Sequence, residues 1–264
     1  METKTFNNIA IAGDIQGINL LLKYIPADKI KCIIASSKNP QDINYLEYLS
    51  FSLKKKIILH LNKTSKNYLN FLEDFKNEGA DAIICNSYSM LFDKKTLEIV
   101  NNQAFCFHES LLPKYKGLDS VRYAIMNNEI ETGVTFFRIT ENINDGDIIY
   151  QEKINIEFED TWRDVQKKLN SLKENILKNN ISNILNNSFL SEKKIDNNEI
   201  PLLKISKKQL EILPLEMTDI QIYNLVRANI EYNDSAYFIY NEKKKSFSEF
   251  ETYEKIQKYF SKYR

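Results

Sequence analysis

The sequence predicts a doubly wound α/β fold, in which helices cover a mostly parallel sheet, followed by a small β-rich C-terminal domain. Two observations predict it. Over the first 107 residues, short apolar runs alternate with longer amphipathic stretches, which is the order of βαβ units. After a polar stretch near residue 200, short apolar segments return. A length of 264 residues accommodates one large domain and one small one.

Five apolar runs in the first part are predicted to be strands. They cover residues 8–12, 30–36, 56–61, 81–87 and 104–107. Amphipathic stretches between them predict helices over residues 17–24, 42–53, 65–77 and 94–100. Two glycines, Gly13 and Gly17, follow the first strand, and a tight turn explains them better than a phosphate cradle, although a helix N-terminus there could receive an anion. Ligands of such sheets bind beyond the carboxyl ends of the strands.

The second half of the chain predicts one long helix and then a change of domain. Apolar spacing predicts an amphipathic helix from Thr161 to Asn187, with Trp162 as a packing anchor. We therefore divide the chain into a large domain (residues 1–190), a polar linker (191–214) and a small β-rich domain (215–264).

Within the small domain, Thr218 and Asp219 are expected to open a helix. Its Arg227 is interpreted as an ion-pair partner at the domain interface. Two β segments are expected at residues 235–240 and 246–251, with Lys243–Lys245 in a solvated turn between them.

Composition excludes several classes of protein. A hydrophobic content of 43% argues against disorder, and 36 basic residues balance 36 acidic ones, so nucleic acid is an unlikely partner on global charge. The N-terminus lacks the pattern of a signal peptide and no apolar run is long enough for a membrane span, so we expect a soluble cytoplasmic protein. Three cysteines and two histidines, widely scattered, predict buried reduced thiols and no metal site.

The chemistry concentrates after the fifth predicted strand. Three of the six glycines, Gly117, Gly133 and Gly146, lie within one stretch that begins near His108. His108 directly follows a buried strand and precedes a loop containing Pro113, so its imidazole is expected to project into the crevice at the carboxyl edge of the sheet.

Two segments in this stretch carry a resemblance. FCFHESLLPKYKG at residues 105–117 and ETGVTFFRITENINDGDIIYQEKINI at residues 131–156 resemble the folate-dependent formyltransferase family. SYSMLFDKKTLEI at residues 87–99 and the tail from residue 217 are also similar to it. The resemblance implies transfer of a formyl group from 10-formyltetrahydrofolate to an amine. It also implies that Tyr88, Ser89, Met90, Leu91 and Asn144 bind this donor.

Family catalysis rests on an Asn, a His and an Asp, and this chain departs from two of them. By resemblance, the histidine is His108, while Cys106 stands at the Asn position and Asn144 at the Asp position. A thiol is a poor hydrogen-bond donor to a developing oxyanion, and a neutral amide cannot accept the proton of the amine. Asp145 or Asp147 could replace the carboxylate. Cys106 could act as a nucleophile with His108, or only fill the volume of the Asn.

The family's acceptors include methionyl-tRNA, glycinamide ribonucleotide and nucleotide-linked amino sugars. Transfer RNA binding should leave a basic footprint, and none is obvious here. Enzymes of the purine pathway usually lack a C-terminal domain. We therefore expect a nucleotide-linked amino sugar, with Lys114, Tyr115 and Lys116 facing its phosphates. Two alternatives stay open, an inactive homologue that only binds folate or nucleotide sugar and an enzyme like methionyl-tRNA formyltransferase. A homodimer is a further possibility.

Overall fold

The computed structural model describes residues 5–38, 40–189, 193, 200–230, 232, 235–249 and 251–263, and it divides the chain into two compact units. The first consists of Met1–His108, Thr135–Gln151 and Lys173–Asn197, and the second of Glu109–Val134, Glu152–Leu172 and Asn198–Arg264. The predicted linker lies partly outside the described residues, at 191–192 and 194–199, and the predicted domain boundaries stay a prediction. No helix among the described residues is long and apolar enough to cross a membrane.

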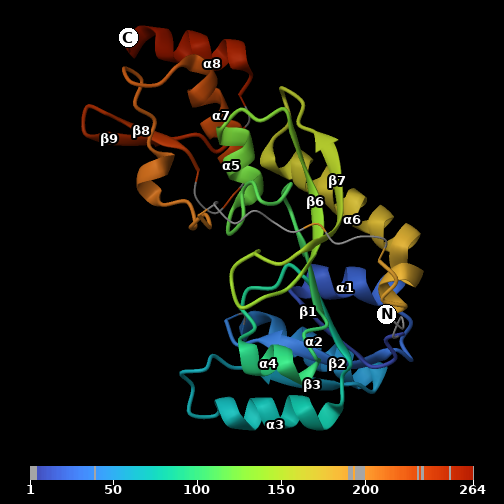
Figure 1. Cartoon of the computed structure of the whole chain (residues 1–264). Coiled ribbons are helices and arrows are strands. Elements are labelled where there is room, and N and C mark those ends of the chain that lie inside the picture. Colours follow the sequence, from blue (N-terminus) through green and yellow to red (C-terminus); the bar gives the residue numbers. More distant parts are fainter. Residues whose placement is uncertain are drawn as a thin grey trace. The chain divides into compact units, whose positions relative to one another are not determined.

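A seven-stranded sheet runs in the order β3-β2-β1-β4-β5-β6-β7 (Figure 1). Its strands are β1 (Ile9–Gly13), β2 (Ile30–Ser36), β3 (Lys56–His60), β4 (Ala82–Asn86), β5 (Ala104–His108), β6 (Glu131–Arg138) and β7 (Ile148–Asn155). The first five strands pair in parallel, and β6 pairs antiparallel with β5. All five predicted strands are confirmed, and the sheet is doubly wound because its order reverses at β1.

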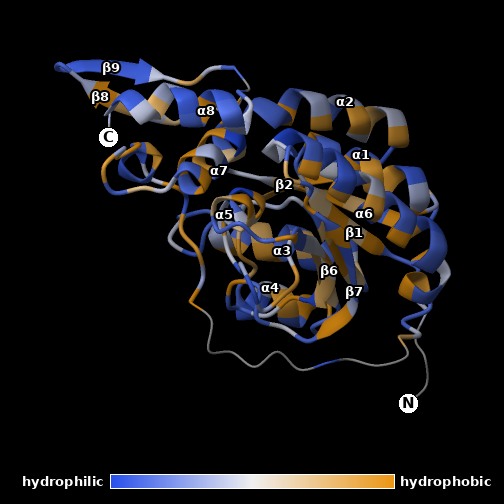
Figure 2. Ribbon diagram, turned by 90° about the horizontal axis from the view of Figure 1, so that it is seen from above, coloured by the Kyte–Doolittle hydropathy of each residue, from blue (hydrophilic) through white to orange (hydrophobic). Residues whose placement is uncertain are grey.

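Helices cover both faces of this sheet. They are α1 (Ile15–Tyr24), α2 (Ile43–Leu53, after the short 3-10 turn η1 at Pro40–Asp42), α3 (Tyr68–Glu78) and α4 (Lys94–Ile99), close to the predicted ranges. Phe71 and Phe75 of α3 and Leu97 of α4 pack in one core cluster with the alternate strand residues Ile83 and Cys85. Figure 1 shows α1 on the opposite face, and in Figure 2 the strands between the helices are hydrophobic.

A single residue separates β1 from α1, so the expected tight turn is present, but Gly13 and Gly17 are needed for close approach to β4 and not for the turn conformation. Neither has a positive φ. A Cβ atom at Gly13 would lie 2.3 Å from the carbonyl oxygen of Asn86, and one at Gly17 would lie 2.1 Å from the same oxygen. A side chain at either position would therefore collide with the main chain of β4. Asp14 caps α1 by accepting a hydrogen bond from the Gly17 amide at 2.6 Å.

The second unit contains most of the C-terminal elements. Its helices are α5 (Ser120–Met126), α7 (Asp219–Asn229) and α8 (Tyr253–Phe260), with the 3-10 turns η2 (Lys207–Leu210) and η3 (Ser261–Tyr263). The strands β8 (Tyr237–Tyr240) and β9 (Lys243–Ser246) form an antiparallel pair. The long α6 (Trp162–Leu185) begins where predicted and contributes residues to both units. Thr218 caps α7 as predicted, in a capping box with Gln221.

Two expectations for the C-terminal end were wrong. Lys243–Lys245 form most of β9 rather than a turn, although their side chains are exposed, and Figure 2 shows β9 as hydrophilic throughout. Of the predicted β segment at residues 246–251, residue 250 lies outside the described residues, and among the others only Ser246 belongs to a strand. Thr252 then caps α8, whose Ile256 and Phe260 are buried at helical spacing. That spacing was the signal that the strand interpretation overlooked.

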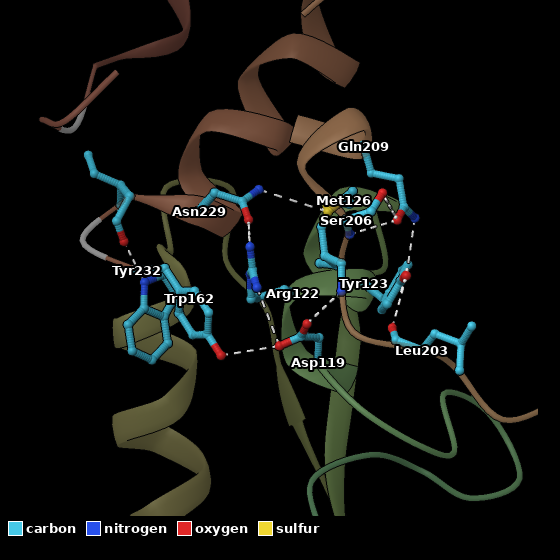
Figure 3. A network of polar contacts seen from close by, with 12 residues as sticks. Asp119, Arg122, Tyr123, Met126, Trp162, Leu203, Ser206, Gln209, Asn229 and Tyr232 are labelled. Atoms are coloured by element: carbon cyan, nitrogen blue, oxygen red, sulfur yellow. Dashed lines mark hydrogen bonds and ion pairs between the residues drawn. The ribbon is translucent and has the colours of Figure 1, made fainter. Parts of the chain in front are cut away.

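A buried polar network connects α5 to α7 in this unit (Figure 3). Asp119 adopts a left-handed conformation (φ 55°), and its carboxylate lies 3.3 Å from the Arg122 guanidinium. It also accepts hydrogen bonds from the main-chain amide of Ile205 at 2.9 Å and the Tyr232 hydroxyl at 3.2 Å. Arg122 donates to the side chain of Asn229, with its guanidinium 3.9 Å from the Tyr232 ring centre. The network therefore fixes the start of α5.

Trp162 and Arg227 have packing roles in the same unit. The Trp162 indole donates to the carbonyl of Ile230 and contacts the Tyr232 ring edge-on at 5.1 Å, so the predicted packing anchor is confirmed. Arg227 is buried and donates to the carbonyl of Asp160 at 2.8 Å and to the Asn224 side chain at 2.8 Å. Its hydrogen bonds therefore go to neutral oxygens and not to the carboxylate that an ion pair requires.

Candidate active site

Strand β5 carries two of the predicted catalytic residues. Cys106 and His108 are two positions apart, so both side chains leave the same face of the sheet. In the sheet register, Cys106 lies beside Cys85 of β4 and Phe137 of β6, and His108 lies beside Thr135 of β6. His108 is 9% exposed and Cys106 is partly buried, with its thiol donating to the Phe107 carbonyl at 3.4 Å.

Cys106 is only partly buried, whereas the other two cysteines are fully buried. Cys32 and Cys85 are buried free thiols, as predicted, and burial raises the pKa of Cys32 to about 12 and that of Cys85 well above its ordinary value. Both therefore stay protonated near neutral pH. Among the described residues, no group of three or more His, Cys, Asp or Glu side chains could hold a metal ion.

Asn144 and Asp145 lie in the loop between β6 and β7. Gly146 holds this loop against β6, since a Cβ atom there would lie 1.7 Å from the Arg138 carbonyl oxygen. Asn144 takes a left-handed conformation (φ 48°), which asparagine tolerates well. Asp145 accepts a hydrogen bond from the Asn142 side chain at 2.8 Å. The backbone around the predicted Asp position is thus fixed by a glycine contact and a local side-chain bond.

A cavity of about 240 Å³ opens on the first unit beside the predicted donor-binding segment. Met90 and Leu91 line it, together with Glu141 from the β6–β7 loop. The structure therefore brings this loop and the segment after β4 to one cavity. Polar and charged groups also border it. They are Lys38, His60, Asn62, Lys63, Tyr68 and Asp93.

Three side-chain contacts hold the predicted donor segment in place. The Tyr88 hydroxyl lies 2.7 Å from Nδ1 of His60, the Ser89 hydroxyl lies 2.7 Å from that of Ser36, and the Ser37 hydroxyl donates to the Met90 sulfur at 3.4 Å. Ser36 and His60 end β2 and β3, so the contacts come from the carboxyl edge of the sheet.

Sequence reasoning missed His60. Its only sequence signal was the one that identified His108, a histidine at the end of an apolar run. Burial lowers the pKa of His60 to about 4, with Asp93 acting in the opposite direction, so the imidazole is neutral near pH 7.

The predicted acceptor-binding residues lie in the second unit, on the loop before α5. Glu129 engages two of them. Its carboxylate lies 3.5 Å from the Lys114 ammonium and accepts a hydrogen bond from the Tyr115 hydroxyl at 2.8 Å. Lys116 is 5% exposed, which is unusual for lysine. Gly117 packs against the main chain of Leu202, with φ 107°. Only Lys114 has the exposure expected of a solvated turn, and the roles of all three stay predictions.

A mostly parallel sheet whose strand order reverses at β1, with helices on both faces, defines the class of doubly wound α/β proteins. The family model for formyl transferases matches residues 22–181, more than half of the 264 residues. The chain therefore belongs to the formyl transferase family.

Two curated relatives are methionyl-tRNA formyltransferases. The protein of Lactobacillus acidophilus is 33% identical over 162 residues, which cover 61% of this chain and 51% of that protein. The protein of Caldicellulosiruptor saccharolyticus is 29% identical over 216 residues, 80% of this chain and 68% of that protein. The chain thus matches about half of the length of the first of these relatives.

Solved structures of sugar formyltransferases are also similar. WlaRD, described as a sugar 3N-formyl transferase with dTDP and 5-N-formyl-THF, is 27% identical, with a TM-score of 0.68 over 90% of this chain and 84% of that one. A 4-N formyltransferase from Francisella tularensis is 20% identical, with a TM-score of 0.73 over 94% of this chain and 99% of that one, a likeness of fold.

Proposed function

We propose that this protein is an N-formyltransferase that transfers the formyl group of 10-formyltetrahydrofolate to the amine of a nucleotide-linked amino sugar. The observation that carries the proposal is the cavity shared by Met90, Leu91 and Glu141, on the same unit as His108. Family membership supports formyl transfer. The likeness to WlaRD over 90% of the chain supports a sugar acceptor.

The cavity suits the ring end of a folate donor. A pterin is flat and carries hydrogen-bonding groups along its edge. The cavity offers both kinds of partner, because Met90 and Leu91 are apolar while Asp93 and Glu141 are acidic. A volume of about 240 Å³ accommodates a bicyclic ring but not a whole folate, so the remainder would extend outside.

His108 is the residue best suited to stabilise the reaction. When the amine nitrogen attacks the formyl carbon, the carbonyl π bond opens and negative charge develops on the formyl oxygen. The carbonyl forms again when the bond from that carbon to N10 of the folate breaks. An imidazole at the end of β5 can donate a hydrogen bond to that oxygen. The amine nitrogen loses one proton and N10 of the departing folate gains one. An imidazole can accept the first proton and pass it to N10.

Cys106 and Asn144 make this site slower than one with the family residues. A thiol is a weaker hydrogen-bond donor than an amide, and Asn144 cannot accept a proton. Losing one oxyanion donor typically reduces the rate about 100- to 1,000-fold. We therefore propose slow turnover, with Asp145 as the nearest carboxylate in the sequence to the substituted position.

The test is formyl transfer by the full chain. Purified protein is incubated with 10-formyltetrahydrofolate and a panel of dTDP- and UDP-linked amino sugars, and products are identified by mass spectrometry. The proposal expects an N-formyl product with at least one sugar, and it expects His108→Ala to abolish that product. The alternative hypothesis is that the protein is an inactive homologue, which the residues Cys106 and Asn144 favour. It predicts that folate or nucleotide sugar raises the melting temperature of the protein but that no formylated product forms.

A second rival is an enzyme acting on methionyl-tRNA, which the curated relatives favour. It expects formyl transfer to methionyl-tRNA and binding that weakens steeply with salt, since tRNA binding releases counterions. Formylation of methionyl-tRNA alone would replace the amino-sugar proposal.

A further inference from the structure

His60 occupies an aromatic stack in which a hydrocarbon ring would pack equally well. It is 2% exposed, and its ring centre lies 4.8 Å from that of Phe71 and 4.8 Å from that of Phe92. The Tyr88 ring is nearly parallel to it at 5.9 Å. A phenylalanine would fill this place without the cost of burying a polar ring. The polarity of His60 therefore calls for a reason other than packing.

One ring nitrogen of His60 has a defined side-chain partner. Nδ1 lies 2.7 Å from the Tyr88 hydroxyl. Burial raises the pKa of Tyr88 and lowers that of His60, so near neutral pH both groups are uncharged. In that state the two groups share a neutral hydrogen bond, in which the phenol donates to Nδ1 in one imidazole tautomer and Nδ1–H donates to the phenol oxygen in the other. A buried hydrogen bond of this kind fixes the relative orientation of the two rings, because breaking it would leave a buried polar atom on each ring without a partner.

Tyr88 begins the segment that lines the cavity. Met90 and Leu91 lie on the cavity wall two and three residues later, and His60 itself is part of that wall. The hydrogen bond between the hydroxyls of Ser36 and Ser89 is a second contact between the carboxyl edge of the sheet and this segment. The orientation of the Tyr88 ring therefore determines where the chain leaves β4 and enters the cavity wall.

We propose that His60 is a positioning residue, which, through its hydrogen bond to Tyr88, sets the path of residues 88–91 and thereby the affinity for the folate donor. This inference rests on the proposed function, because it takes the cavity as the donor site. It assigns a positioning role to a histidine at the carboxyl end of β3, whereas His108 ends β5; these are the two outermost of the five parallel strands.

The experiment measures binding of 5-formyltetrahydrofolate, a stable formyl folate, to the full chain by calorimetry. Variants are His60→Phe, Tyr88→Phe and the double variant. Each single variant keeps the rings but leaves one buried polar atom without its partner, so we expect the Kd to rise about five- to twentyfold. The double variant leaves neither atom unsatisfied and should bind more tightly than either single variant.

Tyr24→Phe is the matched control. It removes a tyrosine hydroxyl that donates to Glu174 at 2.7 Å, away from the residues that line the cavity, and should leave the Kd unchanged. Hydrogen–deuterium exchange without ligand gives a second readout. Amides of residues 88–91 should exchange faster in both single variants and recover in the double variant.

The outcomes separate the two proposals. If the natural chain binds 5-formyltetrahydrofolate and both single variants bind it equally well, the positioning role is overturned while the proposed function stands. If the loss of binding free energy in the double variant equals the sum of the losses in the two single variants, the two residues act independently of their hydrogen bond, and the inference also fails. If the natural chain binds no folate, the donor site and with it the proposed function fail.

Discussion

Replacement of Asp119 by Asn removes one charge from the buried network in Figure 3 while conserving shape. The side chains of Asp119 and Arg122 are 8% and 4% exposed, so water screens neither charge. Breaking a buried ion pair by removing one partner typically costs about 3 to 5 kcal/mol, because the other charge stays buried without compensation. The Asn oxygen can still accept from the Ile205 amide, so we expect the lower end, about 3 kcal/mol.

The chain provides its own local probe for this measurement. Trp162 is the single tryptophan, and its ring contacts Tyr232, which donates to Asp119. Its fluorescence during urea unfolding therefore reports the unit that contains the network. The double variant Asp119→Asn with Arg122→Met removes both charges and should recover part of the loss.

A surface pair of the same unit supplies the control. Glu131 and Lys153 lie 2.8 Å apart with side chains 39% and 66% exposed, so Glu131→Gln should cost less than about 1 kcal/mol. A loss of under 1 kcal/mol for Asp119→Asn, equal to that of Glu131→Gln, would refute the argument that burial makes the network important.

Three further predictions concern the other unit. The pKa of His60 falls from 6.5 in the unfolded chain to about 4, so the unfolded state binds the proton more readily. The free energy of unfolding should therefore fall as the pH drops from 6.5 towards 4, by up to about 3 kcal/mol, and urea unfolding of His60→Phe should lack this contribution. Gly17→Ala should cost about 2 kcal/mol or more by collision with the β4 carbonyl, whereas Gly79→Ala, with open space but φ 68°, should cost about 1 kcal/mol; equal melting temperatures would contradict this. Cys106→Asn with Asn144→Asp should raise the formyl-transfer rate if the site is a weakened form of the family's, whereas loss of activity in Cys106→Asn alone would indicate a thioester on the thiol.

The parallel part of the fold could be predicted because buried strands appear as continuous apolar runs. Every residue of β1 and of β4 is buried, and no alternation obscures them. Strand β9 could not be found in this way. Lys243–Ser246 are all exposed, and pairing with β8, not apolar content, makes them a strand.

The candidate site was predictable only in part. His108 follows an apolar run and precedes a proline and glycine loop, so local sequence identifies it. The role inferred for His60 depends on Phe71, Tyr88 and Phe92, which follow it by 11 to 32 residues and meet it only through the packing of α3 and the segment after β4. No local pattern encodes such a stack.

The interleaving of the two units has a consequence for synthesis of the chain. Residues 1–108 leave the ribosome before their antiparallel neighbour β6, and the first unit is complete only when residues 173–197 have followed. Until β6 has emerged, the outer edge of β5, with Cys106 and His108, presents unpaired peptide groups that can recruit another strand. A released chain truncated after residue 110 should therefore aggregate more readily than one truncated after residue 200.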